Sequence, residues 1–156
     1  MIEALQAFAA SLPEPLTWLG ILVIAAVPLV ESYFGSVIGV LLGLHPAVAI
    51  GLAVVGNVVS MLIFVLSAHG VRRRVTARGE QKEESPRRQK LRERFDRYGV
   101  AGVSLAGQAL LPSQITSAAM VSFGASKNAV IFWQIISIIL WGLAFGVLAS
   151  LGVSFL

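Results

Sequence analysis

The stretch AVPLVES, residues 26–32, predicts the fold of the chain. It places a proline, a glutamate and a serine inside an apolar block, residues 15–70, in which Glu31 is the single charged side chain. Because an internal proline breaks or kinks a helix, the apolar run that begins near Leu16 should end at Pro28. A carboxylate in a membrane segment is costly unless it is protonated, paired or hydrated. The stretch therefore predicts an interrupted membrane element with an acid at the interruption.

Glu31 itself has two interpretations. At a helix break, unwound backbone can line a cavity, and a carboxyl group there would carry a proton or bind a cationic substrate. Alternatively, Glu31 lies at the mouth of a hairpin, near the lipid headgroups, and caps a half-helix. The position beside Pro28 favours the functional interpretation.

The composition supports a membrane location. Of the 156 residues, 56% are hydrophobic and 13% are charged, and the mean hydropathy is +0.83. Soluble domains carry about a quarter charged residues, so a soluble globular domain is close to excluded. Residues 72–97 hold eleven of the twelve Lys and Arg and five acids, a net charge of 11 − 5 = +6. A single basic segment is not the spread basic face that nucleic-acid binding needs, so we expect no nucleic-acid partner.

The break at Pro28 is followed by a short run and then a long one. Residues 35–44 form an apolar run of ten residues that ends at His45-Pro46, and residues 46–70 form an unbroken run of 25. A helix needs about 20 residues to cross the bilayer core, so only the long run is expected to span. Pro46 suits the first turn of that helix, where its missing N–H costs nothing.

The third block, residues 99–156, repeats this plan with Lys127 as its single charge. An apolar run from residue 100 to 111 stops at Pro112, a short run ends at Gly124, and residues 127–151 are long enough to span. Each unit then has a re-entrant hairpin and one crossing helix. An odd number of crossings makes the two units inverted, a plan common among transporters. The alternative merges the short runs into ordinary spans kinked at the prolines.

The predicted architecture is therefore a single all-α membrane domain over residues 1–156. Repeat 1 covers about residues 15–70, a basic loop and an amphipathic helix cover 71–98, and repeat 2 covers 99–156. Lysine and arginine bias places the loop 72–97 in the cytoplasm and both termini outside the plasma membrane. Residues 2–12 predict a short helix at the interface, with a frayed terminus as the alternative. The loop should anchor the chain at the headgroups; substrate or regulator binding there stays open.

The second break carries uncharged hydrogen-bonding groups where the first carries Glu31. If the two hairpin tips meet, Glu31 faces an amide- and hydroxyl-rich wall, although such groups also satisfy backbone freed at a break. The polar residues in the middle of the long helices either bond between helices or belong to the pathway. They are Asn57 and Ser60 in the first long helix and Gln134 and Ser137 in the second. The predicted proton- or substrate-binding residues are Glu31, Asn57, Gln108, Ser113, Gln114 and Thr116, with Pro28, Pro46 and Pro112 as structural breaks.

Small residues indicate close helix packing. Gly35, Gly39 and Gly43 should pack the first hairpin against a long helix, and Gly142, Gly146 and Ser150 suggest a dimer seam. The two histidines are isolated and are expected at helix ends. The chain has no cysteine, no nucleophile–base pair and no second membrane carboxylate. We therefore expect neither an enzyme nor a metal or cofactor site.

Several motifs resemble known families over about residues 20–150. AVPLVES, the glycines 35–43, His45-Pro46 and Val55-Gly56-Asn57 resemble the small multidrug export protein family. RFDRYG at 94–99, GQALLPSQ at 107–114, Gly124 and Trp141-Gly142 resemble the wider DedA-like (VTT-domain) superfamily. The resemblance implies two inverted re-entrant hairpins, transport of lipids or small compounds, an acid at Glu31 and a Gly-Asn step at Asn57.

This chain departs from the superfamily at one point that concerns cargo. DedA-like members usually carry arginines beside the second proline, and here those places resemble Gln108 and Gln114. Arginine binds phosphate tightly, so its absence leaves a neutral or cationic cargo open. The leading hypothesis is a proton-coupled exporter of a small compound, working as a homodimer among membrane lipids. The alternatives are a translocase or scramblase of polyprenyl-phosphate or phospholipid, and a membrane scaffold that transports nothing.

Overall fold

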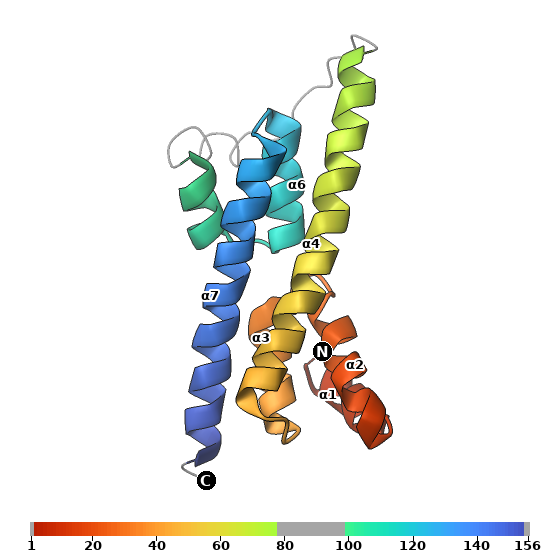
Figure 1. Ribbon diagram of the computed structural model, residues 1–156, viewed down its shortest axis with the longest axis vertical. Coiled ribbons are helices and arrows are strands. Elements are labelled where there is room, and N and C mark those ends of the chain that lie inside the picture. Colours follow the sequence, from red (N-terminus) through yellow and green to blue (C-terminus); the bar gives the residue numbers. More distant parts are fainter. Residues whose placement is uncertain (1, 78–98, 155–156) are drawn as a thin grey trace. The chain divides into compact units, whose positions relative to one another are not determined.

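The computed structural model describes residues 2–77 and 99–154, and all regular structure within them is helical (Figure 1). The helices are α1 Ile2–Ser11, α2 Glu14–Ala25, α3 Glu31–Leu41, α4 Pro46–Ala77, α6 Ser113–Phe123 and α7 Lys127–Ser154, with a further helical segment at residues 99–107. The predicted all-helical class is confirmed. The amphipathic helix predicted near residues 86–98 lies outside the described residues.

The same order of elements occurs twice along the chain. The first hairpin consists of α2, a break at residues 26–30 and α3, and a short loop joins it to the long helix α4. The second hairpin consists of the segment 99–107, a break at residues 108–112 and α6, and a short loop joins it to the long helix α7. The breaks fall at Pro28 and Pro112, and α4 begins at Pro46, as predicted.

Two of the described helices are long and apolar enough to cross a membrane. They are α4, with 32 residues and a mean hydropathy of 2.5, and α7, with 28 residues and a mean hydropathy of 2.2. Only 44% and 22% of these apolar windows are buried inside the protein. The core helix of a soluble protein is mostly buried, so these two helices are compatible with a helical membrane protein.

The predicted boundary of the first long helix at Gly70 is wrong. Helix α4 continues through Arg72, Arg73 and Arg74 to Ala77. Arginine is a good helix former, and one interior glycine costs only about 1 kcal/mol, so the change from apolar to charged residues does not end the helix. The charged region therefore begins as helix and not as loop.

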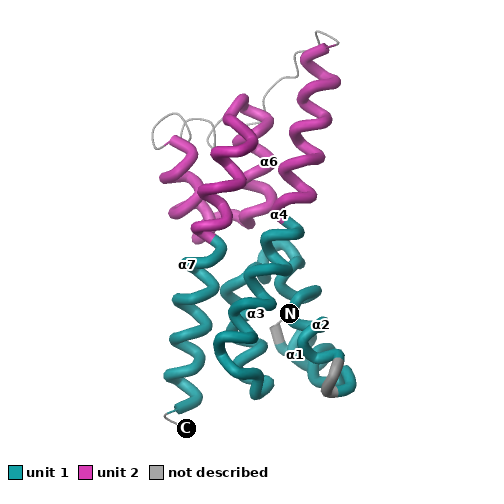
Figure 2. Tube along the Cα trace, viewed as in Figure 1, with its two compact units in different colours: residues 1–60, 138–156 teal, residues 61–137 magenta. Residues whose placement is uncertain are grey.

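The described chain divides into two compact units, shown in different colours in Figure 2. Unit 1 comprises residues 1–60 and 138–156, so it holds α1, the first hairpin, the N-terminal part of α4 and the C-terminal part of α7. Unit 2 comprises residues 61–137, so it holds the rest of α4, the second hairpin and the start of α7. Both long helices thus contribute to both units.

Unit 1 has an apolar core around the first hairpin. Helix α2 packs against α1 and α3, and its buried side chains Ile21, Ile24 and Ala25 join Ala9, Val30, Ile38 and Ala53 in one cluster. The helix predicted for residues 2–12 is thus confirmed as α1, which contributes Ala9 to this core.

Glycines allow the backbones of unit 1 to approach closely. A Cβ on Gly35 would lie 2.7 Å from the Ala25 methyl and 3.1 Å from that of Ala53, and one on Gly39 would lie 2.7 Å from the Ala49 methyl. These two glycines therefore pack the hairpin against α4, as predicted. Gly43 has φ +83°, and a Cβ there would have no described atom within 4 Å. Its role is to allow the turn that follows α3.

The prediction for the glycines of α7 is wrong. A Cβ on Gly142 would lie 3.3 Å from that of Ser32, and one on Gly146 would lie 3.2 Å from that of Ser36. Val54 and Ile50 of α4 also lie against these positions, so both glycines pack against α3 and α4 of the same chain within unit 1. A dimer seam needs a face that the protomer leaves free.

Candidate functional site

The first break holds the chain in an unusual backbone conformation. Leu29 has φ +79° and Glu31 has φ +56°, and they are the only residues other than glycine with positive φ among those described. The left-handed region costs an L-residue about 1–2 kcal/mol. Strain of this kind persists where the surrounding structure fixes it, and it clusters at functional sites.

Glu31 lies in the first turn of α3 and is fully buried. The sequence placed it in the break, whereas the structure places it at the start of the second half-helix. The N-terminal end of a helix carries a partial positive charge, so the backbone of α3 stabilises a negative charge at this position. A carboxyl group held there is shielded from bulk water and shares its helix end with other polar groups.

Small hydroxyl side chains surround this helix end in unit 1. Ser32 and Ser36 are both fully buried. The Ser32 hydroxyl donates a 2.8 Å hydrogen bond to the carbonyl of Ile138 in α7, and the Ser36 hydroxyl donates to the Ser32 carbonyl at 2.6 Å. The first of these bonds ties α3 to α7, so the turn that carries Glu31 is fixed from two helices.

An aromatic cluster covers the next face of α3. The Tyr33 ring lies 4.7 Å from Phe34, 5.5 Å from Phe145 and 6.2 Å from Trp141, measured between ring centroids. Tyr33 also donates from its hydroxyl to the carbonyl of Leu29, at 3.3 Å. Offset and tilted aromatic pairs stabilise packing beyond their buried area. The cluster therefore holds both the α3–α7 contact and the strained break.

The second break has ordinary backbone and neutral side chains. Pro112 precedes α6 with φ −53° and ψ 140°. Ser113, Gln114 and Thr116 are buried in the first turn of α6. The Ser113 hydroxyl and the Gln114 side-chain oxygen are 3.4 Å apart. The sequence placed Ser113 and Gln114 in the break, and here again the structure moves them into the helix.

Unit 2 contains a buried polar contact between the second hairpin and α7. The Ser137 hydroxyl donates a 2.7 Å hydrogen bond to the side-chain oxygen of Gln108. The segment 99–107 and α7 run in the same direction (Figure 1), so Ser104 and Gln134 lie one turn earlier on the same two faces. These four buried side chains form a polar ladder, which consists of Ser104, Gln108, Gln134 and Ser137.

Part of this ladder has no hydrogen-bond partner. Among the described residues nothing bonds to either amide atom of Gln134, to the Ser104 hydroxyl or to the Gln108 side-chain nitrogen. The buried Thr116 hydroxyl is in the same state, and its methyl group lies 3.4 Å from the Cβ position of Gly107. An unsatisfied buried polar group costs several kcal/mol in an apolar medium, so this site is suited to take up water or a polar ligand.

The structure thus divides the predicted site residues into two groups. Glu31 and Asn57 are fully buried in unit 1. Gln108, Ser113, Gln114 and Thr116 are buried in unit 2. That the two groups face one another stays a prediction.

Sequence reasoning missed Ser36 and Ser104, and it missed the aromatic cluster of α3 and α7. Serines spaced like these are common in apolar helices, so the signal was too weak to find them. Gln134 and Ser137 were visible as polar residues in the middle of a long helix, but their partners depend on helix register, which only tertiary structure sets.

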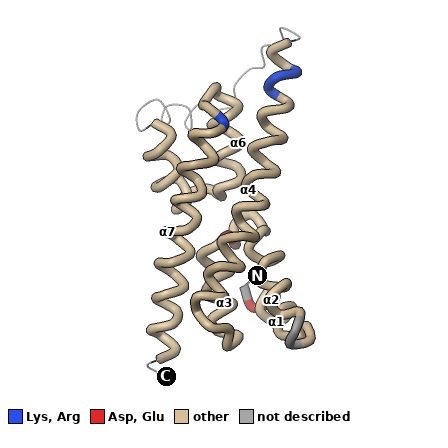
Figure 3. Tube along the Cα trace, in the orientation of Figure 1, with Lys and Arg blue, Asp and Glu red and all other residues tan. Residues whose placement is uncertain are grey.

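Charge within the described residues is concentrated at a few points (Figure 3). Basic side chains occur at Arg72–Arg74 in α4 and at Lys127 at the start of α7. The described acids are Glu3 in α1, Glu14 at the start of α2 and Glu31 at the start of α3. No three His, Cys, Asp or Glu side chains of residues 2–77 and 99–154 are grouped so that they could hold a metal ion. The chemistry of the buried groups in these ranges is that of one carboxyl group together with amides and hydroxyls.

No family model, no curated protein and no solved structure matches this chain. The resemblance to the small multidrug export and DedA-like families stays a prediction from the sequence.

Proposed function

We propose that the chain is a small membrane transporter that exports a small compound in exchange for protons, with Glu31 as the proton- or cation-binding group. The observation that carries the proposal is the fully buried Glu31 carboxyl group at a strained helix break. An ionisable residue in a membrane segment is a functional candidate by default, because removing its charge from water is costly.

A membrane location is supported by the apolar surface of the long helices. Exposed side chains such as Ile63, Phe132 and Leu148 lie along α4 and α7 and are 59–63% exposed. At 1.5 Å per residue, α4 is about 48 Å long and α7 about 42 Å, and both exceed a hydrocarbon core of about 30 Å. In water so much exposed apolar surface would drive aggregation, whereas lipid solvates it.

Re-entrant hairpins are supported by the lengths of the short helices. Helices α2, α3 and α6 have 12, 11 and 11 residues, which is about 17–18 Å each. None of them crosses the core alone. A hairpin of two such helices enters and leaves on one side and leaves its polar break at membrane depth, where it must be buried in protein.

The inverted arrangement is supported by the path of the long helices. Helix α4 leaves unit 1 and enters unit 2, whereas α7 leaves unit 2 and enters unit 1. Each long helix therefore begins in the unit of its own hairpin and ends in the other. In this arrangement the basic end of α4 faces the cytoplasm and both termini face outside.

The proposal is tested with purified protein in proteoliposomes under an imposed pH gradient, with the fluorescent cation ethidium as cargo and an entrapped pH dye as proton reporter. We expect the wild type to couple ethidium flux to proton flux, and Glu31→Gln to lower the coupled flux at least tenfold. Glu3→Gln is the matched control, because it makes the same change at an exposed position of α1, and it should leave flux within twofold.

Coupled flux that survives Glu31→Gln would contradict the role of this carboxyl group. The same vesicles are assayed for flipping of a fluorescent phosphatidylcholine. A wild type that flips lipid and moves no ethidium would replace the proposal with lipid translocation.

A further inference from the structure

The C-terminal end of α4 carries a pocket that the transport proposal does not use. It has a volume of about 410 Å³, within the range of small-ligand sites, and it lies in unit 2. The described residues that line it are His69, Arg72, Arg73, Thr76 and Ala77. None of these is acidic, and four of the five side chains can donate hydrogen bonds.

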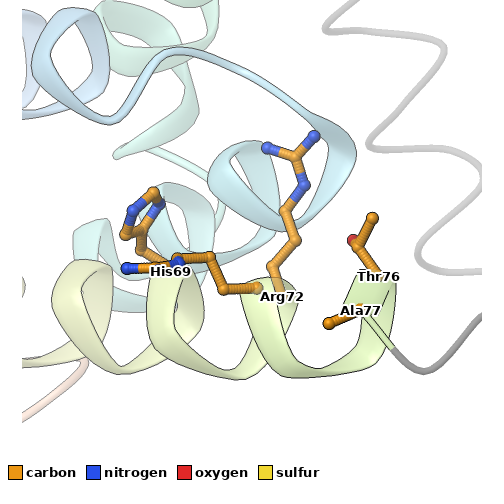
Figure 4. Close-up of a pocket in the computed structure, with 5 residues that line it drawn as sticks. His69, Arg72, Thr76 and Ala77 are labelled. Carbon is orange, nitrogen blue, oxygen red and sulfur yellow. The ribbon is translucent and has the colours of Figure 1, made fainter.

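The four donors share one face of the helix. Their spacing is i, i+3, i+4 and i+7, which places side chains one above another along a helix. Figure 4 shows His69, Arg72 and Thr76 standing on the same side of α4. Arg74 carries the same charge in the same turn but does not line the pocket. The pocket is therefore defined by position on the helix and not by charge alone.

Arg72 is additionally placed by the end of α6. Its guanidinium Nη2 lies 3.2 Å from the position that a Cβ on Gly124 would take. Gly124 closes α6 with φ +112° in the left-handed conformation, which glycine adopts without strain. The C-terminal end of a helix carries a partial negative charge, so the end of α6 attracts the Arg72 guanidinium. This attraction pre-organises the forked pair of N–H donors on that guanidinium.

We propose that His69, Arg72, Arg73 and Thr76 form a binding site for a phosphate-bearing anion. Two guanidinium groups offer planar donor pairs that match phosphate oxygens, and the imidazole and threonine hydroxyl supply further donors around the same space. Two sources carry this chemistry: the headgroup of an anionic phospholipid and a soluble phosphate compound. The site is separate from Glu31 and binds its ligand whether or not the chain transports.

The simpler interpretation of three successive arginines is an electrostatic anchor at the headgroups. An anchor depends on the number of charges near the surface, so Arg74 would contribute as much as Arg72. A phosphate site depends on position, so Arg72 and Arg73 would contribute and Arg74 would not. This difference makes Arg74→Gln the matched control for Arg72→Gln.

The experiment follows the thermal unfolding midpoint of the full chain in a neutral detergent at fixed ionic strength. The probes are inorganic phosphate, dioctanoyl phosphatidylglycerol and, as the zwitterionic comparison with no net charge, dioctanoyl phosphatidylcholine. A ligand that binds the folded state raises the midpoint as its concentration rises. We expect a saturable rise with phosphatidylglycerol or phosphate that exceeds the response to phosphatidylcholine.

The variants then locate the site. Arg72→Gln and Arg73→Gln should each raise the half-saturating concentration at least tenfold, and Arg74→Gln should change it less than twofold. Arg72→Lys keeps the charge and loses the fork, so it should weaken binding several-fold; this variant serves if Arg72→Gln fails to fold. Equal losses for Arg72→Gln and Arg74→Gln would overturn the proposal in favour of an anchor. A wild type that responds to neither inorganic phosphate nor phosphatidylglycerol would also overturn the proposal.

Inorganic phosphate and phosphatidylglycerol also distinguish a soluble phosphate compound from a lipid headgroup as the ligand. Half-saturation by phosphatidylglycerol at a much lower concentration than by inorganic phosphate identifies a membrane headgroup. Equal potency identifies a soluble phosphate compound.

Discussion

The two hairpins have the same order of elements and opposite chemistry at their breaks. The first break is strained, with two L-residues at positive φ, and it leads into a buried carboxyl group. The second has ordinary backbone, and it leads into amides and hydroxyls. A duplicated plan therefore has one half that carries charge and stored strain and another that supplies neutral hydrogen-bonding groups. Under the proposed function, the first half would carry the proton chemistry and the second half would contribute polar recognition.

The two units also differ in how closely their backbones pack. In unit 1 a Cβ on Gly56 would overlap the carbonyl oxygen of Leu22, whereas in unit 2 a Cβ on Gly107 would make ordinary contact with the Thr116 methyl at 3.4 Å. Gly56→Ala should lower the free energy of unfolding by about 3 kcal/mol, because a backbone oxygen cannot move aside. Gly107→Ala should change it by no more than about 0.5 kcal/mol.

Denaturation in mixed detergent micelles measures both glycine variants. Similar losses of stability for the two variants would contradict the expected difference in backbone packing between the units.

The polar ladder of unit 2 allows a second comparison, between a satisfied and an unsatisfied amide. Gln108→Leu removes the bond from Ser137 and leaves a buried hydroxyl unpaired, so it should destabilise the protein by about 1–2 kcal/mol. Gln134→Leu removes an amide with no described partner, so it should stabilise by about 1 kcal/mol.

The thermal unfolding midpoint of each purified variant shows whether the substitution stabilises or destabilises the protein. If Gln134→Leu lowers the midpoint as Gln108→Leu does, then Gln134 is satisfied by a bound water or ligand that contributes to stability. Coupled ethidium flux in the same variants would report whether that water or ligand lies on the transport path.

The smallest effect concerns strain at the first break. Leu29 is 57% exposed and Leu111 is 41% exposed, so glycine substitutions lose little packing at either position. Leu29→Gly relieves about 1–2 kcal/mol of left-handed strain and adds about 0.5–1 kcal/mol of unfolded-state entropy. It should therefore stabilise by about 0.5–1 kcal/mol, whereas Leu111→Gly should destabilise by a similar amount.

Opposite shifts of the thermal midpoint for Leu29→Gly and Leu111→Gly would confirm that the strain is confined to the first break. A loss of stability in both variants would show that the backbone of Leu29 is not strained.

Much of the fold could be predicted from the positions of three prolines in the sequence. Pro28, Pro46 and Pro112 mark boundaries because proline lacks an N–H and fixes φ, and each boundary was found. The end of α4 was missed because charge predicts exposure and does not by itself end a helix. The left-handed backbone of Leu29 could not be predicted from the sequence, because leucine rarely adopts that conformation.

The residues of the candidate site could be predicted from the sequence, but the contacts between them could not. Glu31, Gln108 and Gln114 stand out as polar residues in apolar blocks, and all three are buried. Ser137 as the partner of Gln108 could not be foreseen, because the pairing depends on how two helices 29 residues apart in sequence align along their lengths. The same holds for Gly142 against Ser32, which looked like an outward-facing seam in the sequence.

The sharing of both long helices between the units constrains how the protein is made. Unit 2 is one continuous segment of the chain, but unit 1 needs the first sixty residues together with residues 138–156. During synthesis the first hairpin therefore emerges before residues 138–156, which complete its surroundings. Until that stretch leaves the ribosome, the turn that carries Glu31 lacks the Ile138 carbonyl that Ser32 binds. A product that ends before residue 138 would lack this bond, so the fixing of the turn that carries Glu31 depends on synthesis of α7.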